Sequence, residues 1–522
     1  MGTIRTHYLI RRGRVLSLLS LILACIVSNS HEETIRRNQF PVEFLFGTST
    51  SAYQTEGAIL EGGRGLSNWD VFSHVPGKIE TGENADTADD HYHLYLQDID
   101  LMHSLGINAY RFSISWARIL PRGRFGDVNP TGIAFYNSII DNLLRRGIEP
   151  FVTLYHHDLP QELEDRYGGW LSPLIQEDFG YFAEICFRRF GDRVKYWSSL
   201  NEPNLYAHFA YLRGMYPPGR RSEMEPFTVL HNMLLSHARA AYLYRSRYQQ
   251  KQGGSIGIVV NTAMYEPLRD EAVDREAVSR ALAFYVSGVL DPLIHGDYPP
   301  EMRHHLGARL PKFSVEESKA LNGSIDFIGI NHYSSLYAKD CINSPCPTGE
   351  SHAFLGFVYT TGFRDGVAIG EPTPMPRFFI VPDGLEKMVE YIKTRYNNKP
   401  TFVTENGIAQ LDQPGQREVL LHDNKRVEFL KGYLASLARA IRNGADVRGY
   451  FVWSLMDNFE WTNGFRMRFG LYYVDYQTLE RTPKLSAKWY RDFLTPNATD
   501  EYDDLLVKRS RVANWRGVEV DI

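Results

Sequence analysis

Eight short runs of β-prone residues recur along the chain, each followed by a longer segment with helical or loop character. The runs are Glu43 to Thr48, Ala109 to Ser113, Pro150 to Leu154, Tyr196 to Leu200, Ser255 to Asn261, Asp326 to Ile330, Thr401 to Thr404 and Gly449 to Ser454. Strands that alternate with helices are typical of parallel sheets. No low-complexity segment or Pro/Gly-rich linker divides the series. We therefore predict an α/β fold, a single (β/α)8 TIM barrel with long loops after its strands.

Seven of the intervening segments have a helical pattern. They are Leu94 to Ser104, Ala134 to Arg146, Ile175 to Phe190, Pro226 to Gln249, Glu271 to Tyr285, Leu385 to Asn397 and Asn424 to Asn443. Two long polar stretches that contain Gly and Pro, residues 57–86 and 340–376, follow the first and sixth runs. Loops after the strands surround the active-site face of a barrel, so we expect both stretches to form walls there.

The first 30 residues differ in composition from the rest of the chain. Four arginines precede an apolar run from Val15 to Val27, and small polar residues follow it. This pattern predicts a signal peptide over residues 1–30, a barrel domain over 31–496 and a C-terminal tail over 497–522. The apolar run is short for a membrane span and no second long one follows, so we expect no membrane association after the signal is removed.

Four cysteines are present, of which Cys25 leaves with the signal and Cys186 lies on an apolar helical face. Cys341 and Cys346 lie five residues apart in a predicted loop. In an oxidising compartment such a pair can close a small disulfide ring, and zinc is disfavoured because no further Cys completes a ligand set beside the pair. The sequons at Asn322 and Asn497 are candidate glycosylation sites.

Charge argues against one class of partner. The net charge of −5 is spread along the chain without long basic blocks. Nucleic-acid binding is therefore not supported.

Two of the predicted strands end in a carboxylate. The fourth run leads into Asn201-Glu202-Pro203, and the seventh leads into Glu405-Asn406-Gly407. Proline cannot donate to a strand ladder, so Glu202 is expected where a strand opens into a loop. A lone Glu at a strand end is more often an ion-pair partner or a loop cap. Two of them on one face of a barrel suggest an acid and a nucleophile.

Other strand ends carry polar or aromatic side chains where core packing would favour Val, Ile and Leu. These residues are Gln54, Arg111, His156, Asn331, Tyr333, Trp453, Glu460 and Trp461. Singly, each has a structural explanation, such as a core ion pair for Arg111 or a satisfied core histidine for His156. Their expected convergence on one face favours a binding site.

Several motifs resemble those of glycoside hydrolase family 1, the retaining β-glucosidases. Besides the two Glu motifs they are Phe46 to Gly57, Tyr110 to Trp116 and Trp453 to Trp461, and the likeness extends from Phe40 to about Thr495. The resemblance implies that Glu202 is the acid and base and that Glu405 is the nucleophile. It also implies that the sugar hydroxyls are held by Gln54, His156, Asn201, Glu460 and Trp461. Trp453 would stack beneath the sugar ring and Phe469 would line the pocket. The nucleophile would be surrounded by Arg111, Asn331 and Tyr333.

The chemistry of retention sets expectations for the two carboxyl groups. They should lie roughly 5 to 5.5 Å apart. Glu405 should stay ionised because Arg111 and Tyr333 favour its charged form. Glu202 should have the higher pKa because the Glu405 charge opposes its ionisation.

Two departures from the family pattern alter the leaving-group side. The chain has His156-His157-Asp158 where the family has His-Trp-Asp, and the loop over residues 219–225 is short. The His-His-Asp run could also hold a metal, but adjacent strand residues point to opposite faces, which disfavours that alternative. Two stretches, Phe363 to Gly366 and Pro374 to Phe379, look like the plant branch that acts on monolignol glucosides such as coniferin.

The sequence therefore predicts a secreted retaining β-glucosidase for small, phenolic β-D-glucosides, without metal or cofactor. A transglucosidase with the same residues and a catalytically inactive sugar-binding protein are the alternatives. A thioglucosidase that lacks the acid is disfavoured, since Glu202 is present. The expected destination is the cell wall, with the vacuole as the alternative, and the oligomeric state does not follow from the sequence.

Overall fold

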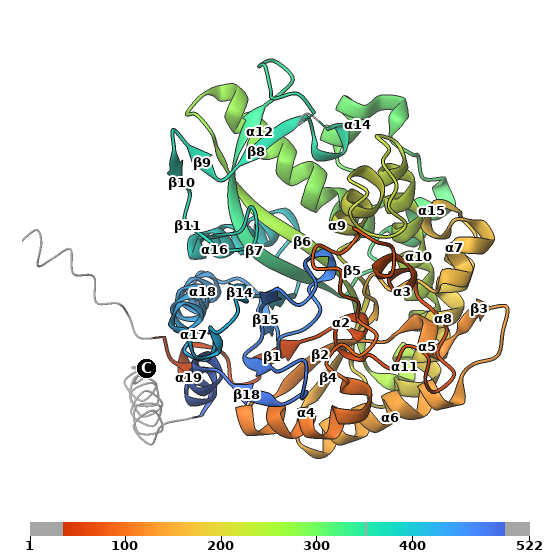
Figure 1. Ribbon diagram of the computed structural model, residues 1–522. Coiled ribbons are helices and arrows are strands. Elements are labelled where there is room, and N and C mark those ends of the chain that lie inside the picture. The colour runs from red at the N-terminus through yellow and green to blue at the C-terminus, as the bar shows by residue number, and fades with distance from the viewer. Residues whose placement is uncertain (1–34, 350–351, 496–522) are drawn as a thin grey trace, which may run out of the picture.

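Eight parallel strands close into a barrel in the computed structural model, which describes residues 35–349 and 352–495 (Figure 1). The strands are β1 (Leu45–Ser49), β2 (Ala109–Ser113), β4 (Glu149–Tyr155), β5 (Tyr196–Asn201), β6 (Ser255–Pro267), β7 (Phe327–Asp340), β13 (Thr401–Asn406) and β15 (Val447–Trp453). Pairing of β1 with β15 and of β13 with β7 closes the ring. The eight predicted runs are thus confirmed as the barrel strands.

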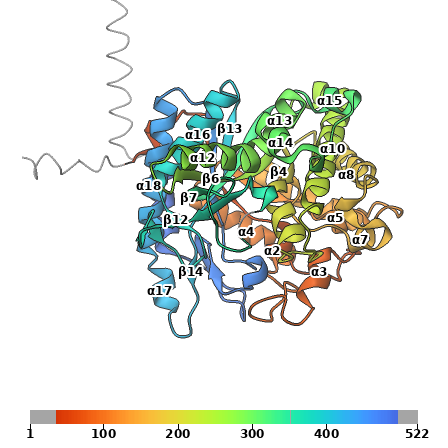
Figure 2. The same cartoon turned by 90° about the horizontal axis from the view of Figure 1, so that it is seen from above.

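Helices cover the outside of the barrel (Figure 2). The long ones are α4 (His91–Leu105), α6 (Pro130–Arg145), α8 (Ile175–Phe190), α10 (Glu225–Arg247), α12 (Ala272–Leu282), α13 (Gly288–His295), α16 (Pro382–Arg395), α18 (Asn424–Arg442) and α19 (Leu485–Leu494). All seven predicted helices are present, and α8 has its predicted bounds.

The predicted helix over residues 271–285 is part of a longer run. After α12 the chain passes through the π-helical turn η4 (Ala283–Ser287) directly into α13. By length and composition Ala272–His295 could cross a membrane, so the expectation of no second long apolar stretch was wrong. Because 78% of its most apolar window is buried inside the protein, the run has the environment of a core helix.

Short elements connect these parts. They are η1 (Arg37–Gln39), α2 (Ala52–Thr55), α3 (Asn68–Ser73), α5 (Trp116–Ile119), β3 (Pro121–Arg124), α7 (Gln161–Tyr167), η2 (Gly169–Leu171), α9 (Pro203–Ala207), η3 (His208–Leu212), α11 (Gln249–Gln252), α14 (Pro300–Leu306), η5 (Gly307–Arg309), α15 (Val315–Leu321), η6 (Ala353–Leu355), β14 (Gln410–Leu411), α17 (Arg417–Leu421), η7 (Trp461–Asn463), β16 (Met467–Arg468), β17 (Tyr472–Val474) and β18 (Arg481–Pro483).

A cluster of phenyl rings fills the barrel near the beginnings of its strands. Phe151 packs edge-on against Phe327, Phe402 and Phe451, with ring centroids 5.3 to 5.4 Å apart. The rings need small neighbours, since a Cβ on Gly47 would lie 2.5 Å from Phe451. This phenyl floor is buried, and the polar side chains predicted for the site lie at the other end of the barrel, where the strands finish.

The two predicted wall stretches contain more regular structure than expected. The first holds the helix α3, which begins with a capping box between Ser67 and Asp70. Strands β6 and β7, which contain the fifth and sixth runs, continue past the barrel, and β8 (Val358–Thr361) pairs antiparallel with β7. The hairpins β9 (Phe363–Arg364) with β10 (Val367–Ala368) and β11 (Glu371–Pro372) with β12 (Phe379–Ile380) follow. The predicted signal peptide, the tail and Asn497 lie outside the described residues.

Candidate active site

Glu405 lies at the end of β13, where two predicted neighbours contact its two oxygens. Arg111 donates from Nη1 to Oε1 at 2.6 Å, and Tyr333 donates its hydroxyl to Oε2 at 2.7 Å. Arg111 is fully buried, so its charge is directed at Glu405 rather than at solvent. Both oxygens of Glu405 are thereby held in a fixed orientation.

Glu202 follows β5 directly and has a left-handed backbone conformation, with φ of 47°. Such a conformation is costly for a residue other than Gly, by about 1 to 2 kcal/mol. Pro203 then begins α9, as its fixed φ and missing N–H allow. Oε1 of Glu202 accepts hydrogen bonds from the Nδ2 atoms of Asn261 at 2.7 Å and Asn331 at 2.9 Å.

Asn201 and Asn331 link the two carboxyl groups. Asn201 Oδ1 accepts from Arg111 Nη2 at 2.6 Å and from Asn331 Nδ2 at 3.1 Å. Asn331 was predicted to surround the nucleophile, and it is the strand neighbour of Glu405 across β7 and β13. Its amide also donates to Glu202 and to Asn201, and its hydrogen bond to Glu405 is among the causes that lower the pKa of that carboxyl group, so Asn331 contacts both carboxyl groups.

Burial is the main cause of the pKa shifts at both carboxyl groups. It raises the pKa of Glu202 to about 8, with the Glu405 charge as the second cause. Only the second cause was predicted from the sequence. Burial also raises the pKa of Glu405, while Arg111 and then Tyr333 lower it as expected without cancelling the upward shift. Glu405 has a cation in contact, whereas Glu202 is contacted by neutral amides.

The remaining predicted sugar-binding residues form one connected wall. Gln54 Nε2 donates to the Phe459 carbonyl at 2.9 Å and approaches Glu460 Oε2 at 3.5 Å. Burial, and after it the Glu405 charge, raises the pKa of Glu460 to about 8. Trp453 and Phe469 pack in one apolar cluster, and Phe469 lies edge-on to Tyr333 at 6.1 Å.

His156 joins this wall to the carboxyl groups. Its Nε2 lies 3.0 Å from Asn201 Nδ2, so that ring nitrogen accepts the hydrogen bond. The ring centroid of His156 lies 5.9 Å from those of both Trp453 and Trp461. The predicted polar and aromatic residues are therefore brought together at one end of the barrel.

The expectation that strand alternation would point His156 and His157 to opposite faces was wrong. His156 and His157 follow the end of β4, and His157 has φ of 74°, so strand alternation does not apply to them. Both rings pack against Trp461. Burial lowers the pKa of His157 to about 3, and its Nε2 lies 3.2 Å from the Asn201 carbonyl. Within residues 35–349 and 352–495, no three His, Cys, Asp or Glu side chains are grouped to hold a metal ion.

Sequence reasoning missed four contributors to the site. Asn261 was placed at the end of the fifth predicted strand, and an amide at that position was the available signal. Tyr285, in η4, donates a hydrogen bond to Asn261. Its place at the end of a predicted helix gave no signal of this role in the sequence. Tyr216 packs on Trp461, and Phe378 stacks on Tyr333 at 5.1 Å, both from irregular loops.

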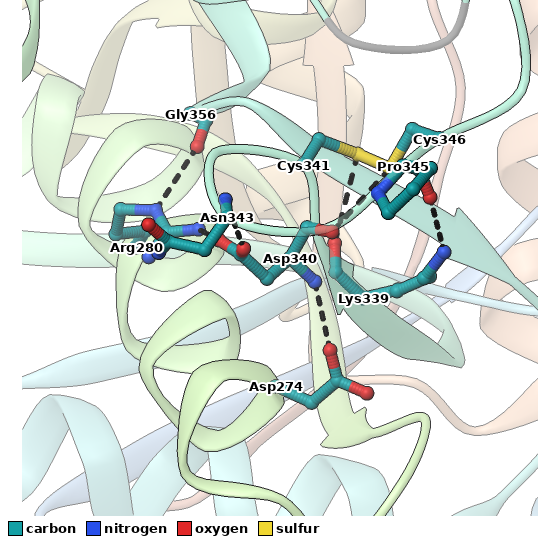
Figure 3. Close-up of a disulfide and its surroundings, with 9 residues drawn as sticks. All are labelled: Asp274, Arg280, Lys339, Asp340, Cys341, Asn343, Pro345, Cys346 and Gly356. Atoms are coloured by element: carbon teal, nitrogen blue, oxygen red, sulfur yellow. Dashed lines mark hydrogen bonds and ion pairs between the residues drawn. A yellow bond between two sulfur atoms is a disulfide. The ribbon is translucent and has the colours of Figure 1, made fainter.

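A disulfide lies at the rim formed by the loop after β7 (Figure 3). Cys341 and Cys346 are joined, as the sequence predicted, with Cα atoms 5.5 Å apart. Asp340, next to this ring, accepts from Arg280 at 2.5 Å, and its N–H donates to Asp274 at 2.9 Å. The disulfide loop is thus tied to α12.

The candidate glycosylation residue Asn322 is exposed and directly follows α15, as glycosylation would require.

Comparison with known proteins adds independent information. The family model described as "Glycosyl hydrolase family 1" matches residues 36–499. A protein of Oryza sativa subsp. japonica named "Probable inactive beta-glucosidase 14" is 56% identical over 474 residues, 88% of this chain and 92% of that protein. The coniferin β-glucosidase of Pinus contorta is 51% identical over 478 residues, again 88% and 92%. A mutant rice β-glucosidase, solved in a covalent complex with Glc, has a TM-score of 0.85 and 43% identity, over 88% of this chain and 100% of that chain.

Proposed function

The chain belongs to glycosyl hydrolase family 1, among its β-glucosidases, and we propose that it hydrolyses β-D-glucosides of small phenolic aglycones. Glu405 is the nucleophile and Glu202 is the acid and base. The observation that carries the assignment is that two buried carboxyl groups have different contacts. A buried carboxylate beside a guanidinium can attack as an anion, whereas one beside neutral amides is suited to hold a proton.

The first chemical step uses both groups at once. Glu405 attacks the anomeric carbon, and Glu202 delivers its proton to the glycosidic oxygen as the bond breaks. A pKa of about 8 keeps Glu202 protonated at neutral pH. The products of this step are the free aglycone and a glucosyl ester on Glu405.

The second step reverses the role of Glu202. Formation of the ester removes the negative charge of Glu405, which is one of the causes that raise the pKa of Glu202. Glu202 then accepts a proton from water as the water attacks the anomeric carbon from the side that the aglycone has left. Two inversions at this carbon give retention of configuration.

The sugar is held by the connected wall. The Glu460 carboxyl and the Gln54 amide are in mutual contact range and can bind sugar hydroxyls, and His156 and Asn201 extend the polar surface. Trp453 offers a flat face on which a pyranose ring stacks. No metal or cofactor is needed for the steps described.

A flat aglycone suits the aromatic surface beside the nucleophile. Phe378 stacks on Tyr333 with an angle of 27° between the rings, and Met375 packs in the same cluster. Such a surface favours a planar phenylpropanoid over a second sugar. The relative from Pinus contorta, whose printed name is a coniferin β-glucosidase, supports this choice.

The test is turnover by the purified protein. We expect release of β-glucose as the first-formed anomer from coniferin, with cellobiose cleaved less efficiently. NMR of the early products reads both the reaction and its stereochemistry, and added alcohol reports any transglucosylation. Equal efficiency on cellobiose would contradict the aglycone assignment. Binding of glucosides without turnover would instead favour an inactive sugar-binding protein, the alternative that the name of the rice relative raises.

We also propose that the protein is secreted. The disulfide between Cys341 and Cys346 and the exposed Asn322 sequon support an oxidising compartment. Mass spectrometry of protein from culture medium would test cleavage near residue 30 and glycan occupancy at Asn322.

A further inference from the structure

The two oxygens of the Glu202 carboxyl group have different surroundings. Oε1 accepts hydrogen bonds from Asn261 and Asn331, at 2.7 and 2.9 Å. Oε2 accepts none from the described part of the chain. An oxygen that already faces two N–H donors has no free direction for a hydrogen of its own. The proton of the neutral acid therefore resides on Oε2.

This assignment depends on which end of the Asn261 amide faces Glu202. With Nδ2 toward Glu202, Asn261 donates to Oε1. With the amide reversed, its oxygen would face Oε1, repel the ionised carboxylate, and favour a proton on Oε1 instead. The orientation of one amide thus decides which carboxyl oxygen carries the transferable proton.

Tyr285 holds that orientation. Its hydroxyl donates to Asn261 Oδ1 at 2.9 Å. Asn204 links the two residues, because its Nδ2 donates to the backbone carbonyl oxygens of Asn261 and Tyr285, both at 2.9 Å. Its Oδ1 also accepts from the Asn261 backbone N–H at 3.2 Å. The tyrosine and the amide are therefore fixed relative to each other.

We propose that Tyr285 is a positioning residue for the acid and base step, because its hydroxyl orients the Asn261 amide and so keeps the transferable proton of Glu202 on Oε2. The proposal rests on the role proposed for Glu202. Tyr285 reaches the reacting group only through Asn261, from the turn between α12 and α13.

The substitution Tyr285→Phe removes the hydroxyl alone. For glucosides with poorly acidic leaving groups, such as hexyl β-glucoside, we expect kcat/KM to fall about tenfold, since proton delivery is less well directed. For 2,4-dinitrophenyl β-glucoside we expect kcat/KM within about twofold of wild type, because this phenolate leaves without a proton. The Asn261 hydrogen bond lowers the pKa of Glu202, so its loss should move the basic limb of the pH profile upward.

Asn261→Ala and the double variant provide the second measurement. If Tyr285 acts through Asn261, the double variant should be no worse than Asn261→Ala alone, since coupled residues are not additive. Tyr391→Phe is the matched control. It removes a hydroxyl that lies 2.7 Å from Ser287 of the same turn η4, and that pair has no contact with Glu202 or Asn261 among the hydrogen bonds of the described residues. Its leaving-group dependence should equal that of wild type.

Three results would overturn the proposal: equal losses on both substrates, an unmoved basic limb, or additive effects of the two substitutions. Thermal unfolding of each variant separates these results from a loss of folded protein. Failure of the proposed function is distinguishable, because then Glu202→Ala itself would show no dependence on the leaving group. In that case the dependence of kcat/KM on the leaving group would be the same in the wild-type protein and in every variant.

Discussion

Arg111 donates to Glu405 from one nitrogen and to Asn201 from another, both at 2.6 Å, while its own side chain is fully buried. One guanidinium therefore favours the charged form of the proposed nucleophile and fixes the position of an amide that contacts His156, a proposed sugar-binding residue. Its removal should affect binding and chemistry together.

Arg111→Met should reduce kcat/KM by about a hundredfold or more, the scale of losing a directed charge in a closed site. Arg111 lowers the pKa of Glu405, so its loss should raise that pKa and move the acidic limb of the pH profile to higher pH. Arg111→Lys is the control, since it keeps a positive charge without the forked geometry. An acidic limb that stays in place in Arg111→Met would contradict the assignment.

Glu405→Gly should abolish hydrolysis of all glucosides while the protein stays folded, because the side chain faces the site rather than the apolar core. Supplied with α-glucosyl fluoride, which resembles the lost intermediate, the variant should form new β-glucosides with added acceptors. Product analysis and a thermal unfolding curve test both parts. Substantial remaining hydrolysis would identify another residue as the nucleophile.

Glu202→Ala should lose most activity on glucosides of poorly acidic alcohols but keep the first step on activated aryl glucosides. With those substrates the intermediate should accumulate, because water lacks its general base, and a burst of phenolate should precede a slow steady state. Azide needs no base, so its addition should restore turnover and give β-glucosyl azide. A uniform loss without azide rescue would mean that the acid lies elsewhere.

Glu202→Gln should make thermal stability less dependent on pH. Burial raises the pKa of Glu202 from 4.5 to about 8, so the folded state binds this proton more tightly than the unfolded chain does. The resulting stability is fully present below about pH 4.5 and is lost as pH rises toward 8. The variant cannot ionise there, so its melting temperature should exceed that of wild type at pH 8.5 and match it near pH 4.5. The exposed substitution Glu316→Gln should leave the wild-type pH dependence unchanged.

The barrel was predictable because its signals are local. Each strand is a short apolar run bounded by turn residues, and β2 has its predicted bounds, Ala109–Ser113. The ends of β6 and β7 were not predictable in the same way. Both strands continue beyond the barrel because they pair with each other and because β7 also pairs with β8, and a partner distant in sequence leaves no local pattern.

The site was predictable where a side chain ends a strand and less so where it comes from a turn. Glu202, Glu405 and Asn331 follow from strand ends, although only the structure shows that Asn331 contacts Glu202. The role of Tyr285 could not be predicted from the sequence pattern, because its orientation depends on the π-helical turn η4, which leaves no local sequence signal. The size of the burial effect on Glu202 was also missed, since burial depends on the assembled walls rather than on neighbours in sequence.

The phenyl floor limits the routes by which molecules can reach and leave the site. Phe151, Phe327, Phe402 and Phe451 fill the barrel near the beginnings of its strands, so in the proposed reaction both reactants and products would pass the other end, beside the carboxyl groups. In the proposed mechanism the aglycone must depart by that route before water can reach the glucosyl ester. A departing phenol and an arriving nucleophile therefore take turns in the same space, and any alcohol that lingers there competes directly with water for the sugar.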